Sequence, residues 1–224
     1  VFDTYNEHFP LLIKFIDANS DLSVQVHPND RLAAQLHGEN GKTEMWYVLA
    51  ADEQAKINVG FTTPVNKEKL EHHIQSGTLE EILNYVPTKA GDVFYLPAGK
   101  VHAIGKGVLL AEIQQTSDIT YRLYDYNRKD KNGKLRPLHI EEAYQAIDYE
   151  NNDNQPIRIS PEKNKTQLLV RSPYFVTNLL FFDQKVEKIY IETDSFVIYI
   201  CVEGEALIRY DGGEETISKG ECVL

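Results

Sequence analysis

The sequence has little of what marks secreted or membrane-spanning proteins. Its 224 residues include only two cysteines, Cys201 and Cys222. That is too few for the disulfide framework of a secreted domain, so both are predicted to be buried, reduced thiols of a cytoplasmic protein. No apolar run approaches the roughly 18 residues that a membrane-spanning helix needs. No basic segment followed by an apolar one resembles a signal peptide, so we expect no membrane association.

Basic residues are also in short supply. Asp and Glu number 34 against 23 for Lys and Arg, which gives a formal net charge of -11. This balance argues against binding to nucleic acid, and an anionic ligand would need a local basic cluster at its site. The remaining composition, 42% hydrophobic and 25% charged, is that of a folded globular protein and excludes the disordered and fibrous classes.

Two short segments carry the strongest pattern in the chain. In the first, Val24 and Val26 alternate with Gln25 and His27, which is typical of a strand whose two faces differ. The second is an apolar strand entered through a Gly-Asp turn at 91–92 and closed by a proline, with His102 just beyond it. Each polar residue alone is as well explained by a hydrogen-bonded place in the core, so the argument depends on their combination.

The first half of the chain is predicted to be mainly β. Strands are expected at 9–15, 22–27, 43–49, 55–61, 93–96, 101–104, 108–114 and 120–123. A short helix is expected at 31–37, with Asp30 as its N-cap. Residues from about 64 to 86 form a predicted helical insertion, with helices at 67–74 and 78–83, the second opened by a capping box from Thr78 to Glu81.

The second half is predicted to hold a linker and another β domain. Residues 125–165 are polar and contain one short helix at 140–147, which is typical of a linker. Six short strands follow, at 168–170, 175–182, 188–191, 196–202, 205–210 and 214–217, which favours a sandwich or barrel. Residues 218–224 resemble 89–96, which indicates an internal repeat. We therefore predict domains at 1–124 and 166–224, the second without a metal because its hairpin at 196–210 has no histidine.

The candidate metal ligands are Gln25, His27, Glu44 and His102, all in the first half. Two imidazole nitrogens with a carboxylate and an amide oxygen suit zinc, with manganese and iron(II) as alternatives. Fewer than six protein ligands leaves a position for water or substrate, which favours catalysis over a purely structural role.

These residues resemble the two motifs of the cupin superfamily, the second being Gly91, Asp92, Pro97 and His102 in their characteristic spacing. Gln25 stands where most metal cupins have histidine. Together with residues 41–46 (GKTEMW) and 112–126 (EIQQTSDITYRLYDY), the chain resembles the short, bacterial form of type I mannose-6-phosphate isomerase over essentially its whole length.

The resemblance implies two cupin-type (jelly-roll) β-barrels, the first with the helical insertion and the second truncated. It also implies that a Trp-Gly-Gly segment upstream and the final strands are missing, so we expect a piece of a longer protein. The four candidate ligands would hold one zinc ion per chain, and Lys42, Asp118 and Arg122 match positions implicated in catalysis or substrate binding.

Chemistry assigns a task to each of these residues. Interconversion of an aldose and a ketose moves a proton between adjacent carbons through an enediolate, so it needs a base and a stabiliser of negative oxygen. Lys42 shares a strand face with Glu44, and a divalent ion nearby would make its ammonium lose a proton more readily, so it is the candidate base. The alternative is a solvated hairpin charge. Arg122 would stabilise the oxygen and needs an anionic partner, either Asp118 or the substrate.

Other charged residues have two interpretations each. Glu112 either assists ring opening or holds Lys42 or Arg122. Lys100 and Lys106 flank His102 and could bind the phosphate of a sugar phosphate, but ordinary surface lysines are as good an explanation. His37 and His139 have no partner pattern and receive no role.

The leading prediction is a zinc-dependent isomerase that interconverts mannose 6-phosphate and fructose 6-phosphate. An iron(II) cupin oxygenase is an alternative, since two histidines and a carboxylate can leave positions open for oxygen. A cupin that binds sugars without turnover is another. The sequence does not predict the oligomeric state.

Overall fold

The structure is a computed structural model, which describes residues 9–129, 131–151 and 153–224. The chain separates into two compact units, one extending to Asp183 and one containing Gln184–Leu224. Strands outnumber helices in the described residues, so the prediction of a mainly β protein is confirmed. The predicted domain limits at 124 and 166 stay predictions, and each unit is described by itself.

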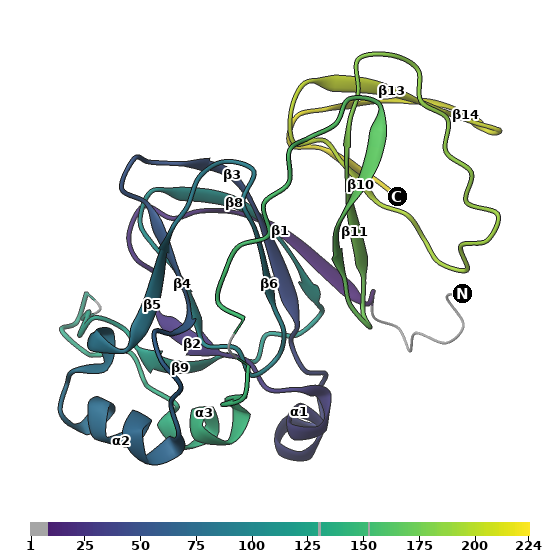
Figure 1. The fold of residues 1–224 in the computed structure, drawn as a ribbon. Helices are drawn as coiled ribbons and strands as arrows, with labels where there is room; N and C mark the ends of the chain where they lie inside the picture. The colour runs from purple at the N-terminus through teal and green to yellow at the C-terminus, as the bar shows by residue number, and fades with distance from the viewer. Residues whose placement is uncertain (1–8, 130, 152) are drawn as a thin grey trace. The chain divides into compact units, whose positions relative to one another are not determined.

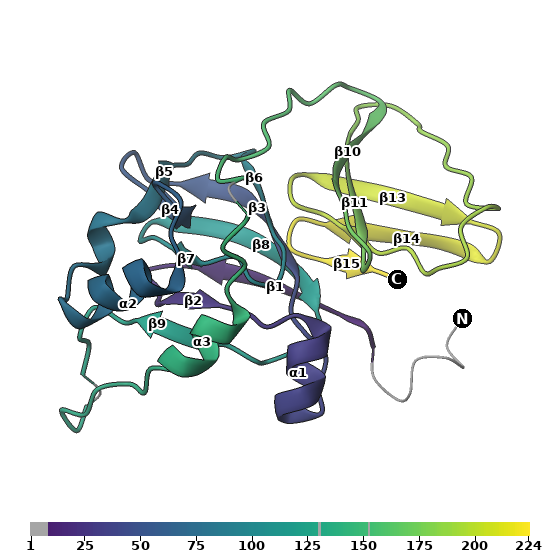
Figure 2. The same cartoon turned by 60° about the horizontal axis from the view of Figure 1, so that its bottom comes forward.

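The first unit contains two antiparallel sheets. One has four strands in the order β1 (Leu11–Asp17), β8 (Val108–Gln115), β3 (Glu44–Ala51) and β6 (Val93–Leu96). The other has five, in the order β5 (Leu83–Pro87), β4 (Lys56–Phe61), β7 (His102–Ile104), β2 (Val24–Val26) and β9 (Tyr121–Tyr124). Figures 1 and 2 show how these strands lie in the ribbon.

A buried core joins the two sheets. Trp46 and Phe94 from the four-stranded sheet pack in one cluster with Ile57 and Ile104 from the five-stranded sheet. Successive side chains along a strand point to opposite faces of the sheet, so one face of each of these strands reaches this core. The sheets therefore face each other across a shared interior.

Helices cover the opposite face of the five-stranded sheet. α1 (Asp30–His37), α2 (Lys67–Gln75) and α3 (Ile140–Ala146) gather near β2 and β9 in both views (Figures 1 and 2). Val24 and Val26 of β2 belong to a buried cluster with Leu70 of α2 and Ala143 of α3. Because neighbours along a strand point to opposite faces, Gln25 points away from the helices and into the interior between the sheets.

Local predictions around the helices need two corrections. The N-cap of α1 is Asn29, whose side chain accepts the Leu32 amide, and not Asp30. Asp30 is instead engaged outside the helix, where Oδ1 accepts the Gly41 amide at 2.9 Å and Oδ2 accepts the Tyr174 hydroxyl at 2.6 Å.

The predicted helix at 78–83 is also wrong. Only Leu79–Glu81 forms a short 3-10 turn, and the Thr78 side chain makes no capping hydrogen bond. Leu83 begins β5, because it pairs with Phe61 of β4 and thereby buries an apolar side chain in the sheet.

After α3 the first unit continues into a hairpin of β10 (Lys165–Arg171) and β11 (Val176–Phe181). The second unit contains β12 (Tyr199–Ile200), β13 (Glu205–Tyr210), β14 (Gly213–Ser218) and β15 (Cys222–Val223). The predicted strand at 188–191 is not formed. Ile189 and Ile191 are 81% and 91% exposed, so the apolar run that suggested the strand is not buried by the described residues.

The expectations about membrane-spanning helices and about the burial of the two cysteines can be compared with the structure. No helix in the described ranges is long and apolar enough to cross a membrane. Cys201 is half-buried and Cys222 is exposed, both with free thiols, so the prediction that both are buried is wrong.

Candidate metal centre

Three of the four predicted ligands form a compact buried cluster. His27 follows β2, Glu44 begins β3 and His102 begins β7, so both sheets contribute. One potential ligand atom from each residue lies within 4.8 Å of those of the other two. All three residues are at most 1% exposed.

Some polar atoms of this cluster lack the partners that buried groups need. Nε2 of His27 and Oε1 of Glu44 are buried without a hydrogen-bond partner among the described residues, while Oε2 of Glu44 is paired with the Lys42 ammonium at 2.9 Å. Nε2 of His102 lies 3.3 Å from Glu44 Oε1, and Nε2 of His27 lies 3.5 Å from Glu44 Oε2. Desolvation of a carboxylate is costly unless a cation or donors compensate it, so this arrangement fits a metal ion bound among the three side chains.

Both imidazoles are held in the orientation that metal ligation requires. Nδ1 of His27 is 2.8 Å from the Ile119 carbonyl, and Nδ1 of His102 is 2.8 Å from the Lys100 carbonyl. Only a protonated nitrogen can donate to a carbonyl, so each neutral ring keeps its lone pair on Nε2. Such backbone partners fix the tautomer of metal-binding histidines.

Gln25 completes the predicted set from β2. It pairs with His102 across the β2–β7 ladder, and its Nε2 is 3.3 Å from His102 Nε2. A half-turn of the amide about its last bond would present Oε1 to the same place. An amide oxygen beside two nitrogens and a carboxylate fits zinc coordination.

Burial and neighbouring charges set the protonation states of the cluster. Burial lowers the pKa of His102 to about 3, although the nearby Glu44 carboxylate opposes that shift. Burial alone would raise the pKa of Glu44, but Lys42, His27 and His102 outweigh it and hold that pKa well below its usual value. At neutral pH the cluster therefore contains a neutral His102 and an ionised Glu44, which are the forms that bind metals.

Lys42 lies directly beside the cluster. Its side chain is buried, and Nζ is 2.9 Å from Glu44 Oε2. The hairpin position that could have been solvated is instead covered, with Lys42 only 5% exposed. The ammonium is thus a close electrostatic partner of Glu44.

A second lysine faces the same interior, and the sequence analysis missed it. Nζ of Lys14 on β1 donates to Glu112 Oε1 at 3.0 Å and to Gln114 Oε1 at 2.5 Å. Glu112 Oε2 accepts the Trp46 indole at 2.9 Å, so its observed partners are Lys14 and Trp46. A signal existed in the sequence: Lys14 shares a strand face with apolar Leu12 and Ile16, where an unpaired lysine would be unfavourable.

Arginines gather where β9 ends. Arg122 pairs with Gln25 in the ladder, which puts both on the same sheet face, and its Nη1 donates to the Pro137 carbonyl at 3.1 Å. Arg128 and Arg136 both form ion pairs with Asp125. This is a local basic cluster of the kind expected for an anionic ligand.

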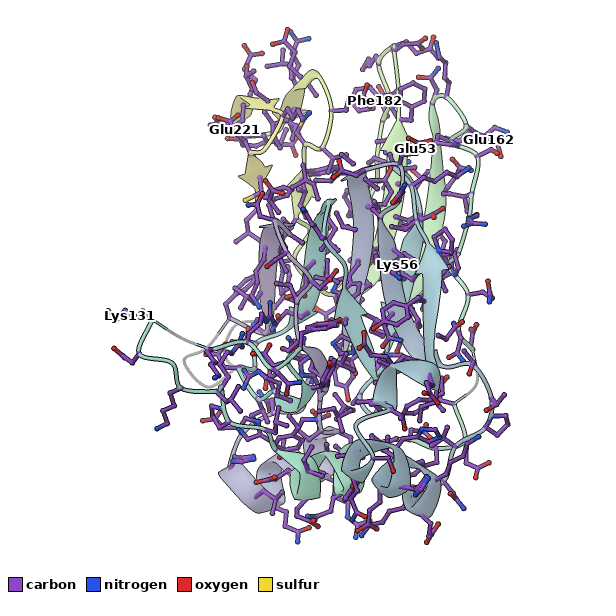
Figure 3. The ribbon with its side chains drawn as sticks, turned by 90° about the vertical axis from the view of Figure 1, so that its left-hand side faces the viewer. Glu53, Lys56, Lys131, Glu162, Phe182 and Glu221 are labelled. Carbon is purple, nitrogen blue, oxygen red and sulfur yellow. The ribbon has the colours of Figure 1, made fainter. Side chains whose placement is uncertain are left out.

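The loop after β9 carries this basic cluster, and Lys131 on that loop projects away from the strands (Figure 3). Asp118 is exposed in the segment between β8 and β9, beyond the buried ligands. Nε of Arg122 is buried without a hydrogen-bond partner among the described residues. Arg122 therefore retains a donor for a ligand.

The two lysines that flank His102 differ from each other. Lys106 is exposed. Lys100 is only 2% exposed, and its Nζ donates to Asn151 Oδ1 at 2.9 Å, the Asn151 carbonyl at 3.2 Å and Asn154 Oδ1 at 2.6 Å. Burial lowers the pKa of Lys100 to about 8.

Comparison with known proteins gives the family. Residues 1–62 match the family described as phosphomannose isomerase type I, catalytic domain. Over 217 residues the chain is 48% identical to mannose-6-phosphate isomerase of Streptococcus mutans, an alignment that covers 96% of this chain and 68% of that protein. The chain belongs to the type I mannose-6-phosphate isomerase family. The predicted family and its enzyme class are confirmed.

Other mannose-6-phosphate isomerases support the assignment. An enzyme of Bacillus subtilis is 52% identical over 144 residues, which cover 63% of this chain and 45% of that one. The crystal structure of the Bacillus subtilis mannose 6-phosphate isomerase is 35% identical and matches with a TM-score of 0.83, covering 97% of this chain and 69% of the other.

A mannose 6-phosphate isomerase crystallised with zinc and yttrium shares the fold at 18% identity and a TM-score of 0.65. That match covers 95% of this chain and 73% of the other. The chain thus spans about two thirds, or less, of the curated relatives compared above.

Proposed function

We propose that this chain carries the zinc-dependent centre of an isomerase that interconverts mannose 6-phosphate and fructose 6-phosphate. The observation that carries the proposal is the buried cluster of His27, Glu44 and His102, in which Nε2 of His27 and Oε1 of Glu44 have no hydrogen-bond partner among the described residues. Together with Gln25 these residues would hold one zinc ion per chain. When bound, zinc would supply Lewis-acid stabilisation of negative charge on the substrate oxygens.

Lys42 is the proposed base. The isomerisation removes a proton from C2 of the aldose and returns one to C1 through an enediolate, so the base must lie close to both carbons. The amine of Lys42 must be neutral to accept that proton. Glu44 alone favours the charged ammonium, and a bound dication would share the carboxylate charge and release this constraint.

Arg122 is proposed to stabilise the oxygen charge that develops in the enediolate. Its side chain shares a sheet face with Gln25, and its Nε has no hydrogen-bond partner among the described residues. Asp118 is proposed to orient that guanidinium or a substrate hydroxyl. Arg128 and Arg136 add positive charge nearby, which suits a phosphorylated substrate in an acidic protein.

Glu112 has two proposed roles, and its observed partners are Lys14 and Trp46 where Lys42 or Arg122 was predicted. It holds the ammonium of Lys14 and the indole of Trp46, so it can fix both groups in the interior. A carboxylate between a lysine and the sugar could also move a proton during ring opening. Substrate binding by Lys100 stays a prediction, and its contacts with Asn151 and Asn154 favour a different use.

The two predicted cupin-type barrels are part of this proposal. We infer that the two facing sheets form a cupin-type barrel and that the strands from about residue 166 onward belong to a second one without a metal. The strong match to the Bacillus subtilis isomerase structure supports this architecture.

A coupled enzymatic assay tests the function. The chain should form fructose 6-phosphate from mannose 6-phosphate, a chelator should remove the activity, and added zinc should restore it. Equal turnover before and after complete metal removal would contradict the proposal. Binding of the sugar phosphate without any turnover would favour a non-catalytic sugar-binding protein instead.

A further inference from the structure

One turn of the chain contacts His27, His102 and Thr43, the residue before Glu44. Within residues 97–102, the Gly99 amide donates to the His27 carbonyl at 2.9 Å. The Lys100 carbonyl accepts from His102 Nδ1 at 2.8 Å. The Ala98 amide donates to Thr43 Oγ1 at 3.2 Å, next to Glu44 in the sequence. We name residues 97–102 the histidine turn, and its position governs the position of the ligands.

The outer side of the histidine turn is fixed by the segment that follows α3. The Asp148 amide donates to the Gly99 carbonyl at 2.9 Å. Gly99 has a φ of +88°, and a Cβ added there would lie 2.8 Å from Asp148 Cβ, so only glycine fits this approach. The segment after α3 therefore packs directly on the histidine turn.

The Lys100 side chain makes the second connection between these two segments. Three acceptors, from Asn151 and Asn154, match the three donors of an ammonium. Asn154 is itself anchored, because its Nδ2 donates to the Phe61 carbonyl at 2.8 Å and its own carbonyl accepts from Asn84 Nδ2 at 3.2 Å. Lys100 thus ties the histidine turn to strands β4 and β5 through the asparagines.

We propose that Lys100 is a positioning residue for the metal centre and not a ligand of the substrate phosphate. Its three donors are used inside the protein, and its own carbonyl holds His102. The proposal rests on the function proposed above, because positioning has meaning only if the cluster binds a metal. Loss of the ammonium would leave the asparagine oxygens unpaired and release the histidine turn.

Lys100→Met tests the proposal in the full chain. It keeps the length of the side chain and removes the three donors. Loss of a group that orients a metal ligand typically reduces metal affinity by about 10-fold to 100-fold, and we expect a loss of that size. The affinity is measured by competition between the apo-protein and a chromophoric zinc chelator. Turnover at a fixed zinc concentration should fall while the KM for mannose 6-phosphate stays within about twofold, since Lys100 would not touch the substrate.

Three further variants make the test specific. Lys106→Met removes the exposed lysine on the other side of His102 and should leave zinc affinity unchanged. Asn151→Leu removes the side-chain oxygen that accepts from the ammonium, leaves the Asn151 carbonyl in place and should reproduce part of the loss, which keeps the test valid if Lys100→Met does not fold. Asn151→Asp retains the oxygen that accepts from Lys100 and should restore near-normal affinity.

Several outcomes would overturn the proposal. One is a folded Lys100→Met protein, with cooperative thermal unfolding, that binds zinc as tightly as the unmodified chain. Another is an unchanged zinc affinity with a raised KM and weaker inhibition by inorganic phosphate, which would make Lys100 a phosphate ligand. If the unmodified chain neither binds zinc nor isomerises mannose 6-phosphate, the proposed function fails and this inference fails with it.

Discussion

Replacement of Lys42 by methionine removes the positive charge and keeps an unbranched side chain of similar length. Nζ of Lys42 lies 2.9 Å from a Glu44 carboxylate that is 0% exposed. At that separation two unit charges attract by about 6 kcal/mol in an effective dielectric constant of about 20. Removal of one partner from a buried ion pair typically costs about 3–5 kcal/mol of folding free energy, because the other charge stays buried and uncompensated.

The loss of folding free energy should depend on whether zinc is bound. In the metal-free chain, Lys42→Met removes the ammonium beside Glu44, so we expect the full loss of about 3–5 kcal/mol. With zinc bound, the dication compensates the carboxylate and the loss should be less than half as large. By linkage the variant should bind zinc at least as tightly as the unmodified chain. Turnover should nevertheless fall by about 10²-fold to 10⁴-fold, the usual contribution of a general base.

Urea denaturation with and without zinc measures the loss of folding free energy in each form, and the coupled assay measures turnover. Lys106→Met is the control, because that lysine is exposed and should change neither stability nor turnover. Equal destabilisation of the metal-free and zinc-loaded proteins would refute the argument that zinc and Lys42 compensate the same carboxylate. Full activity of Lys42→Met would refute its assignment as the base.

Three other predictions follow from single contacts. The pKa of His102 is about 3 in the folded chain and 6.5 in the unfolded chain. Between these pH values only the unfolded chain binds a proton at His102. The free energy of unfolding of the metal-free chain should therefore fall by up to about 1.4 kcal/mol per pH unit as the pH drops from 6.5 towards 3. A pH-independent unfolding free energy over that window would contradict it. Gly99→Ala should destabilise the chain by about 1–3 kcal/mol, since its φ is +88° and Asp148 blocks a Cβ; an unchanged melting temperature would be inconsistent with this packing. Trp46→Phe removes a donor to Glu112 and should reduce stability by about 1–3 kcal/mol, measured by urea denaturation; a neutral effect would show that this hydrogen bond is not important.

The candidate metal cluster could be predicted because its signal is local. His27 lies one alternation from Gln25 on a strand with two unlike faces, and His102 follows a turn and a proline at a characteristic spacing. Such short patterns can be recognised without knowing which strands pair. The position of Lys42 beside the cluster could be predicted for the same reason, because Lys42 is two residues from Glu44.

Contacts between residues far apart in the sequence were not predicted. Lys14 contacts Glu112, 98 residues away, because β1 pairs with β8. For Lys100 the sequence allowed a phosphate ligand or an ordinary surface lysine, and it did not predict the contacts of the ammonium with Asn151 and Asn154. No local sequence pattern predicts these side-chain contacts.

The secondary-structure errors have a related cause. Thr78 to Leu83 has good local helix signals, but the pairing of Leu83 with β4 outweighs them. Residues 188–191 have a good local strand pattern, and the described residues provide no sheet that buries Ile189 and Ile191.

The central claim is that His27, Glu44 and His102 hold the metal on which isomerisation depends. The most direct test is a zinc titration of the apo-protein in which bound metal and turnover are measured together, for the unmodified chain and for His102→Ala. The account predicts that turnover of the unmodified chain rises in proportion to occupancy and stops at one zinc per chain, while His102→Ala binds zinc weakly and stays inactive. Stoichiometric, tight zinc binding by His102→Ala, or full turnover of the unmodified chain before any zinc is added, would contradict it.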